Sequence, residues 1–125
     1  MPKVAAVFAT MNRSATAVAC VRALAAQTRP PELVVVADNV STDETVTKLK
    51  GLPGLPFHLV VHQMNENRGN AGGVQEAMDF AFTEGVDAVW ILDDDSWPRP
   101  DALEALIKEP WDPKVVRHSL QIDPN

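Results

Sequence analysis

Three adjacent aspartates form the group of residues in this sequence that is best suited to chemistry. Asp93, Asp94 and Asp95 directly follow an apolar run at residues 89–92. Carboxylates gathered at the end of a buried strand repel one another when ionised, so they need a positive partner. A divalent cation supplies that charge, and hard oxygen ligands suit Mg²⁺ or Mn²⁺, with diphosphate oxygens and water completing the coordination. Asp93 and Asp95 are the predicted metal ligands, because alternate residues of an extended chain point to the same side.

Two other interpretations of the acidic run stay open at this point. It could be a solvated acidic turn that caps the next helix, since short motifs often arise without function. It could also belong to a phosphatase that phosphorylates an aspartate after a strand. Those enzymes have Asp-x-Asp-x-Thr or Val near the chain start, whereas Trp97 stands in the final position here and the run comes late.

Polar residues also follow the three earlier apolar runs of the chain. They are Thr10, Asn12 and Arg13 after the first run, Asp38 and Asn39 after the second, and Asn65, Asn67 and Arg68 after the third. In a parallel sheet, ligands bind outside the carboxyl ends of the strands, near the point where strand order reverses. We therefore expect these residues and the aspartates to converge on one edge of a sheet.

Individual residues of this edge allow more than one interpretation. Arg13 and Arg68 are its candidate cations, because a guanidinium group suits phosphate oxygens. Taken singly, each is more typical of a solvent-exposed arginine. Asp38 can accept hydrogen bonds from a base or ribose, and it can also begin a turn with Asn39. Trp97 either flanks a ligand beside the acidic run or only lies near it.

A glycine-rich loop is predicted at residues 65–73. Its glycines permit close approach of the backbone to a ligand. The spacing is not G-x-G-x-x-G, and the Lys-Ser/Thr ending of a Walker A sequence is absent, so dinucleotide-type and P-loop phosphate binding are both excluded. The histidines His58, His62 and His118 show no metal-ligand spacing and receive no assigned chemistry.

Strands alternate with helices along the sequence, and this arrangement would position the polar residues. Strands are predicted at residues 4–9, 33–37, 57–61 and 86–92, with a further strand at 115–122. Helices are predicted after Ser14, which can serve as an N-cap, after the capping box at 41–44 with Ser41 as its N-cap, from the end of the glycine-rich loop to Phe82, and over 100–108. The alternation predicts an α/β fold with a mostly parallel sheet and helices on both faces.

Composition restricts the class of protein. The 125 residues fit one small domain, and 46% hydrophobic content is enough for a core. A net charge of −6 argues against nucleic-acid binding, which needs clustered Lys and Arg. Cys20 is the only cysteine and is expected to be a packed thiol, which suits a reducing, cytoplasmic location. No apolar run approaches the roughly 20 residues of a membrane span.

Several segments resemble family 2 glycosyltransferases. Residues 10–13, 27–31 and 36–43 look like the opening of that family. Residues 65–73 and 91–101 are similar to its branch of galactofuranosyl- and rhamnosyltransferases. The resemblance implies a GT-A fold, in which a Rossmann-like nucleotide-binding half is joined to an acceptor-binding half.

The resemblance also implies roles for the matching residues. Thr10 and Asn12 would line the nucleotide pocket, and Asp38 would hydrogen-bond a uracil or thymine ring. Asn67 and Gly69 would belong to a loop closing over the nucleotide. Arg13 would approach the diphosphate, Asp94 would lie close to the ribose or donor sugar, and Asp93 and Asp95 would bind the metal. The implied reaction is inverting transfer of a sugar from a UDP-galactofuranose or dTDP-rhamnose type of donor to an acceptor hydroxyl. The acceptor would be a saccharide or lipid-linked, which could bring the protein to the inner face of a membrane.

The sequence departs from the family after Lys108, where members continue with an acceptor-binding part that supplies the general base. Asp112 and Asp123 are available carboxylates, but each precedes proline in a turn-like context. The catalytic base is therefore left unassigned. Residues 1–125 are expected to be a nucleotide-sugar-binding domain from a longer glycosyltransferase, and to self-associate through an exposed contact face. A non-catalytic nucleotide-binding or self-associating module is the alternative.

Overall fold

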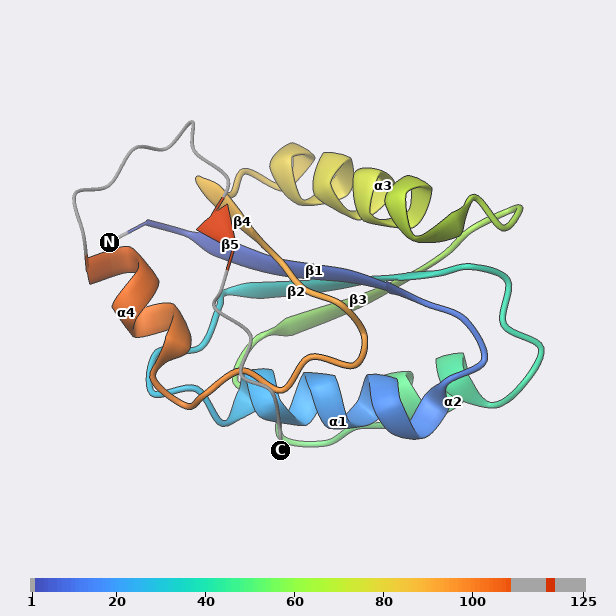
Figure 1. Cartoon of the computed structure of the whole chain (residues 1–125), viewed down its shortest axis with the longest axis horizontal. Helices are drawn as coiled ribbons and strands as arrows, with labels where there is room; N and C mark the ends of the chain where they lie inside the picture. Colours follow the sequence, from blue (N-terminus) through green and yellow to red (C-terminus); the bar gives the residue numbers. More distant parts are fainter. Residues whose placement is uncertain (1, 109–116, 119–125) are drawn as a thin grey trace.

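In a computed structural model of the chain, which describes residues 2–108 and 117–118, strands alternate with helices from end to end (Figure 1). The elements are β1 (Val4–Thr10), α1 (Ser14–Ala25), β2 (Leu33–Asp38), α2 (Thr45–Lys50), β3 (His58–Gln63), α3 (Gly69–Thr83), β4 (Ala88–Ile91), α4 (Ala102–Lys108) and β5 (Arg117–His118). The predicted α/β class is confirmed. Strand β5 falls within the predicted strand at 115–122, whose other residues lie outside the described ones.

The five strands form one sheet in the order β3-β2-β1-β4-β5. All four pairings are parallel. The chain places β2 and β3 on one side of β1 and then crosses to place β4 on the other side. Strand order therefore reverses between β1 and β4, which is where ligands bind in sheets of this type.

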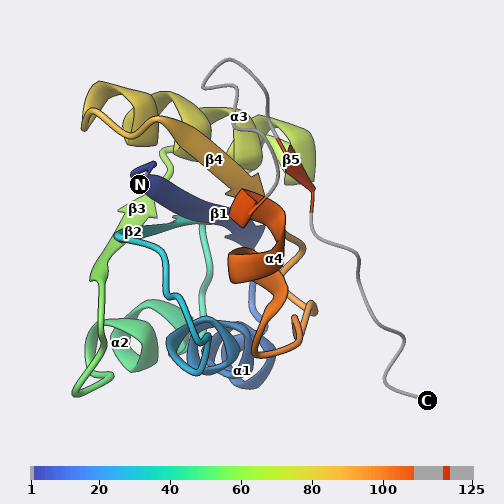
Figure 2. The same cartoon turned by 90° about the vertical axis from the view of Figure 1, so that its left-hand side faces the viewer.

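Helices cover both faces of the sheet, as predicted. Helix α3 lies on one face, whereas α1, α2 and α4 lie on the other (Figures 1 and 2). Alternate residues of β1 supply the two cores: Val4, Ala6 and Phe8 belong to the cluster that includes α1, and Ala5, Val7 and Ala9 to the cluster that includes α3. Every residue of β1 and β2 is buried, and both strands are continuous apolar runs up to their last residues, the polar Thr10 and Asp38.

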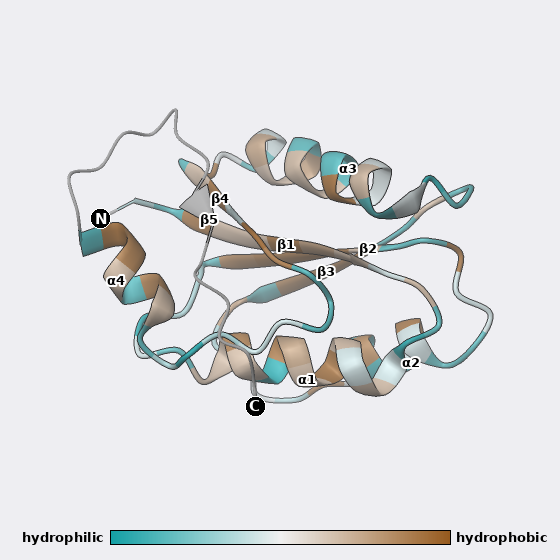
Figure 3. Cartoon of the chain, viewed as in Figure 1, coloured by the Kyte–Doolittle hydropathy of each residue, from teal (hydrophilic) through white to brown (hydrophobic). Residues whose placement is uncertain are grey.

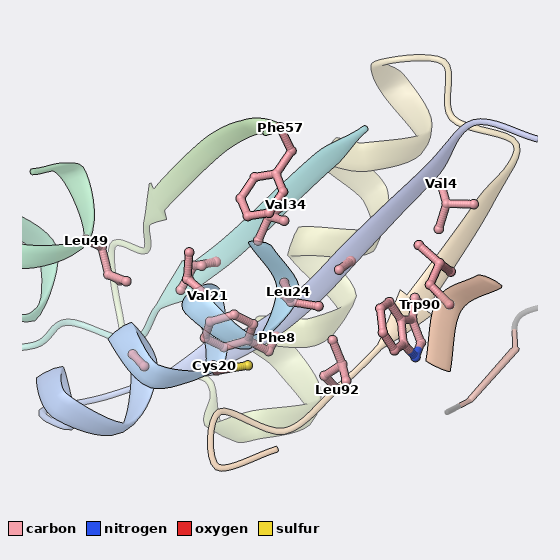
Figure 4. Close-up of a cluster of buried hydrophobic side chains, with 14 residues drawn as sticks. Val4, Phe8, Cys20, Val21, Leu24, Val34, Leu49, Phe57, Trp90 and Leu92 are labelled. Atoms are coloured by element: carbon pink, nitrogen blue, oxygen red, sulfur yellow. The ribbon is translucent and has the colours of Figure 1, made fainter. Parts of the chain in front are cut away.

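The larger cluster contains the bulkiest buried side chains. Phe8 and Trp90 lie within it, between the sheet and α1 and α4 (Figure 4). The sulfur of Cys20 is also buried there, which confirms the predicted packed thiol. Apolar colours follow the central strands, whereas the loop after β4 is hydrophilic (Figure 3).

Both predicted helix caps are wrong. Helix α1 begins at Ser14 itself, and Arg13 stands at its N-cap without a side-chain cap hydrogen bond. Helix α2 begins at Thr45, three residues later than a capping box with Ser41 as the N-cap requires. The hydroxyl of Ser41 is engaged elsewhere, because it donates to Asp38 Oδ1 at 2.6 Å.

The second half of the predicted glycine-rich loop, residues 69–73, is helical and forms the first turns of α3, which begins at Gly69. Gly69 has a φ of 71°, a conformation that favours glycine. A Cβ on Gly73 would lie 2.8 Å from the Cβ of Ala9, so glycine there lets α3 rest directly on β1. Tertiary packing has overridden the low helix propensity of glycine.

Candidate functional site

A cavity of about 270 Å³ opens at the carboxyl ends of the strands. Its lining residues are Ala9, Thr10, Met11, Arg13, Asn39, Asn67, Gly69, Asn70 and Asp94. They come from the ends of β1 and β2, the start of α3 and the turn after β4. The cavity therefore lies at the reversal of strand order, and it brings together five residues expected at the site: Thr10, Arg13, Asn67, Gly69 and Asp94.

Asp94 joins the two strands that flank the reversal. The hydroxyl of Thr10 donates to Asp94 Oδ2 at 2.9 Å, and Arg13 Nη1 donates to Asp94 Oδ1 at 3.0 Å. Asp94 is 7% exposed. A buried carboxylate is costly unless its oxygens have partners, and each oxygen has one here. Asp94 thus fixes both Thr10 and Arg13 against the acidic run.

Arg13 also faces the next aspartate. Its Nη2 lies 4.0 Å from Asp95 Oδ2, and the two side chains are 50% and 54% exposed. The guanidinium group therefore stands between a buried carboxylate on one side and an exposed one on the other. This ion pair is solvent-screened, and contacts of this kind add little to stability.

Asp93 and Asp95 are exposed on either side of the buried Asp94. A tight turn holds them, since the Asp93 N–H donates to Ser96 Oγ at 3.1 Å and the Ser96 N–H donates to the Asp93 carbonyl at 3.0 Å. Exposed carboxylates at alternate positions fit Mg²⁺ or Mn²⁺. Among the described residues, no group of three or more His, Cys, Asp or Glu could hold a metal. A cation held by Asp93 and Asp95 would therefore need its remaining ligands from outside the described residues.

Cys20 lies directly beneath this turn. Its Sγ approaches the carbonyl oxygen of Asp93 at 3.8 Å. Burial, and then the negative charges of Asp94, Asp95 and Asp93, raise the pKa of the thiol to about 12. The thiolate is the reactive form, so Cys20 is an inert part of the core that supports the acidic run.

Asp38, at the end of β2, is nearly fully buried at 1% exposure. Its Oδ1 accepts from the Ser41 hydroxyl at 2.6 Å and its Oδ2 accepts from the Ser41 N–H at 3.0 Å. Val40, inside this turn, has a φ of 58°. Asp38 does close a turn, as one of its two interpretations predicts. It is not among the residues that line the cavity.

Asn12 connects the loops after β1 and β2. Its Oδ1 accepts from the Thr42 N–H at 2.7 Å and the Asp43 N–H at 3.2 Å, and its own N–H donates to Ser41 Oγ at 2.8 Å. Its φ of 50° is unusual for a residue other than glycine. Asn12 therefore shapes the rim of the cavity and is absent from its lining residues.

Asn39 also lines the cavity, at the edge of the sheet where its place after the second apolar run predicts it, although no binding role was predicted for it. Its Nδ2 donates to the Gly69 carbonyl at 3.0 Å, and its Oδ1 accepts from the Arg68 N–H at 3.2 Å. At 4% exposure, this amide is a buried bridge between β2 and the start of α3. The only sequence signal was an asparagine directly after a buried strand.

Two residues of the segment before α3 differ in their placement. The Asn67 Oδ1 accepts from the Gly69 N–H at 2.9 Å, so Asn67 closes the rim of the cavity. The guanidinium of Arg68 turns away and donates to Glu76 Oε1 at 2.8 Å. Glu76 Oε2 meets His62 Nε2 at 2.7 Å, and these hydrogen bonds, that from His62 foremost, lower the pKa of Glu76. Of the two candidate cations, only Arg13 therefore lines the cavity.

Comparison with known proteins relates the chain to enzymes of sugar transfer. The model of the family described as glycosyl transferase family 2 matches residues 6–115. Galactofuranosyltransferase GlfT1 of Mycobacterium tuberculosis (strain CDC 1551 / Oshkosh) is 38% identical over 73 residues, which are 58% of this chain and 23% of that protein. GlfT1 of Mycolicibacterium smegmatis is 33% identical over 95 residues, or 76% of this chain and 30% of that protein.

Solved structures show the same fold. The mannosyltransferase PcManGT from Pyrobaculum calidifontis, in complex with GDP-Man and Mn²⁺, has a TM-score of 0.72 and 29% identity, covering 91% of this chain and 34% of that one. S. aureus TarS 1-349 in complex with UDP has a TM-score of 0.74 and 24% identity, covering 85% and 31%. These are GT-A glycosyltransferases, so the expected GT-A fold is confirmed. The chain spans between about a quarter and a third of the length of the proteins it matches.

Proposed function

We propose that this chain, which belongs to glycosyl transferase family 2, binds the nucleoside diphosphate of a sugar donor at the carboxyl edge of its sheet. The observation that carries this proposal is the meeting of Arg13, Asp94 and the start of α3 in one cavity. That cavity lies at the reversal of strand order. The complexes of the structural neighbours with UDP, or with GDP-Man and Mn²⁺, support the same ligand class.

The charged side of the cavity suits the diphosphate. Arg13 would donate to its oxygens, since guanidinium groups bind phosphate in a forked geometry. The first N–H groups of α3 would add positive partial charge. Asp93 and Asp95 would hold Mg²⁺ or Mn²⁺. When bound, the cation would neutralise negative charge on the departing diphosphate. Asp94 would keep Arg13 and Thr10 in place beside the ribose or donor sugar.

The other side would receive the nucleoside. Asp38 stands one strand away from the reversal, with its carboxylate oriented by Ser41, and we assign it to the uracil or thymine ring. Asn67 and Gly69 would close over the nucleotide from the start of α3. Thr10 and Asn12 complete the pocket, Thr10 from the floor and Asn12 through the rim that it stabilises.

The whole protein would transfer a sugar, with inversion, from a UDP-galactofuranose or dTDP-rhamnose type of donor to a saccharide or lipid-linked acceptor. Residues 1–125 would be its nucleotide-sugar-binding domain, and the acceptor site and general base would come from the additional length that the relatives have. Exposed apolar side chains support this division. Met11, Val40 and Trp97 all follow carboxyl ends of strands and are between 41% and 44% exposed. Among the described residues, no helix is long and apolar enough to cross a membrane.

Calorimetric titration with UDP and dTDP, each with and without Mn²⁺, tests the proposal. We expect Mn²⁺-dependent binding in the wild-type chain and loss of that dependence in Asp95→Ala. Asp79→Ala is the matched control, because Asp79 is on α3 and accepts a hydrogen bond from Gln75 within the same helix. Metal-dependent binding that survives unchanged in Asp95→Ala would remove the acidic run from the site.

A further inference from the structure

We propose that Arg13 is a built-in counter-ion of the acidic run, which moves to the diphosphate when a divalent cation takes its place, so that cation and diphosphate bind cooperatively. This inference rests on the proposed function and adds a direction to it: in the absence of nucleotide, Arg13 opposes metal binding. A residue that only bound phosphate would not do so.

The first support is the position of Arg13 between two carboxylates. Its Nη1 lies 3.0 Å from Asp94 Oδ1, and its Nη2 lies 4.0 Å from Asp95 Oδ2. Asp95 is one of the two residues assigned to the metal. A guanidinium charge so close to Asp95 offsets part of the negative charge that would attract a cation, and it repels the cation directly.

The second support is that Arg13 is the one Lys, Arg or His among the described residues that line the cavity. Arg68, the other candidate cation of this edge of the sheet, donates to Glu76 and is turned away from the cavity. Asp94 and Asp95 therefore share this cation. An incoming diphosphate adds further negative charge, and until a metal binds, Arg13 is the charged side chain of the described cavity lining that can attract it.

The third support is that Asp94 keeps one of its two hydrogen-bond partners when Arg13 leaves. The Thr10 hydroxyl holds Asp94 Oδ2 at 2.9 Å whatever Arg13 does. The Arg13 side chain is 50% exposed, so its movement disturbs no core packing. The Arg13–Asp95 contact joins two half-exposed side chains and contributes little free energy. Beside the less exposed Asp94, the charge of the incoming cation would replace the charge of Arg13.

Coupling between two ligands is reciprocal in binding free energy. If the diphosphate draws Arg13 away from Asp95, the metal site strengthens, and a bound metal must strengthen diphosphate binding by the same factor. Removing the guanidinium should thus have opposite effects on two affinities. Mn²⁺ alone should bind more tightly, and UDP should bind less tightly.

The test is Mn²⁺ binding to the nucleotide-free chain, followed by electron paramagnetic resonance of the free ion and repeated with saturating UDP. In Arg13→Gln we expect Mn²⁺ alone to bind about three- to tenfold more tightly, as the loss of one nearby screened charge allows. The UDP-induced gain in Mn²⁺ affinity should shrink by a factor of about ten, within the usual range of coupling. Arg22→Gln, at an exposed position of α1, is the control for net charge. Arg13→Lys keeps the positive charge, so its affinity for Mn²⁺ alone should stay close to that of the wild type.

Circular dichroism establishes that each variant is folded before it is compared. Unchanged or weaker Mn²⁺ affinity in folded Arg13→Gln, with metal-dependent UDP binding intact in the wild type, would overturn the counter-ion role and leave the proposed function standing. A wild-type chain whose UDP binding ignores Mn²⁺ would refute the proposed function and this inference with it.

Discussion

On the β4 side of the cavity the contacts join ionised side chains, whereas on the β2 side they join neutral amides to backbone groups. The charged edge consists of Thr10, Arg13 and Asp93–Asp95, with an Arg13–Asp94 pair at 3.0 Å. The amide edge consists of Asn12, Asn39 and Asn67. The side chains of Asn12 and Asn39 hydrogen-bond backbone groups of a facing segment, and that of Asn67 accepts from the N–H of Gly69 in its own segment.

The two kinds of contact imply that one edge maintains the shape of the cavity and the other binds the ligand. Arg13 and Asp95 are both half-exposed, so their contact is screened and contributes little to stability, and Arg13 can exchange this partner. A buried amide whose partners are lost costs the full desolvation of each orphaned group. The buried amide of Asn39 should therefore hold the cavity open in one shape, with the exposed Asn12 and Asn67 supporting its rim. The charged edge should determine what enters the cavity.

The largest effect is expected for Asn39→Ala. The substitution leaves the Arg68 N–H and the Gly69 carbonyl without their buried partner. We expect a loss of about 2–4 kcal/mol in the free energy of unfolding, measured by urea denaturation. Asn70→Ala, at an exposed lining position, should cost less than about 0.5 kcal/mol. Equal losses in the two variants would show that the amide edge has no structural role.

Gly73→Ala should follow, with a loss of about 1–3 kcal/mol from overpacking. The added Cβ would lie 2.8 Å from Ala9 Cβ and 3.0 Å from Asn39 Nδ2, which pushes α3 away from both β1 and the amide edge. Gly51→Ala is the matched control, since its nearest new contact is 3.3 Å from the Thr47 carbonyl oxygen. Thermal unfolding compares them, and a neutral Gly73→Ala would mean that α3 can shift without cost.

Arg13→Ala and Asp38→Asn should affect ligands in different ways. Arg13→Ala should weaken UDP by a factor of about ten and uridine little, because the lost charge-assisted contact is to phosphate. Asp38→Asn should weaken UDP and uridine by similar factors, because the lost contact is to the base. Titrations at two salt concentrations should show the Arg13 effect shrinking in high salt. If the two variants behave alike, the division between the edges is wrong.

The smallest effect concerns the support behind the amide edge. The pKa of Glu76 is lowered below its ordinary value of 4.5, first by the hydrogen bond from His62 and then by that from Arg68. Because the folded-state pKa is the lower one, this contribution to stability is present above pH 4.5 and is lost as the pH falls through the folded value. Urea midpoints at neutral pH and near pH 3 should therefore change less in Glu76→Gln than in the wild type. If the urea midpoint fell equally in the variant and the wild type at low pH, the ionised Glu76 would contribute nothing to stability.

The sequence could place the residues of both edges, but it could not predict the contacts of the amide edge. Aspartates after an apolar strand reach the carboxyl edge in any parallel sheet, so Asp93 to Asp95 could be placed without knowing their neighbours. The partners of Asn39 are backbone atoms 29 and 30 residues away, and no residue pattern encodes such contacts. Ser41 does not cap α2 as predicted, because its hydroxyl donates to Asp38. The start of α3 was predicted as a loop because of its glycines, whereas glycine at position 73 serves the close contact of the helix with Ala9.

The central place of β1 sets an order of events as the chain is synthesised. The amide edge joins residues 30 apart, Asn39 and Gly69, whereas the charged edge joins Thr10 to Asp94 across 84 residues. Strands β1 to β3 can therefore pair, with α3 closing on them, before the residues of β4 have been made. Until β4 arrives, one long side of β1 has no strand beside it, and unpaired apolar edges invite pairing with other chains. The nascent chain would thus be most prone to aggregate during the interval in which its binding cavity is half built.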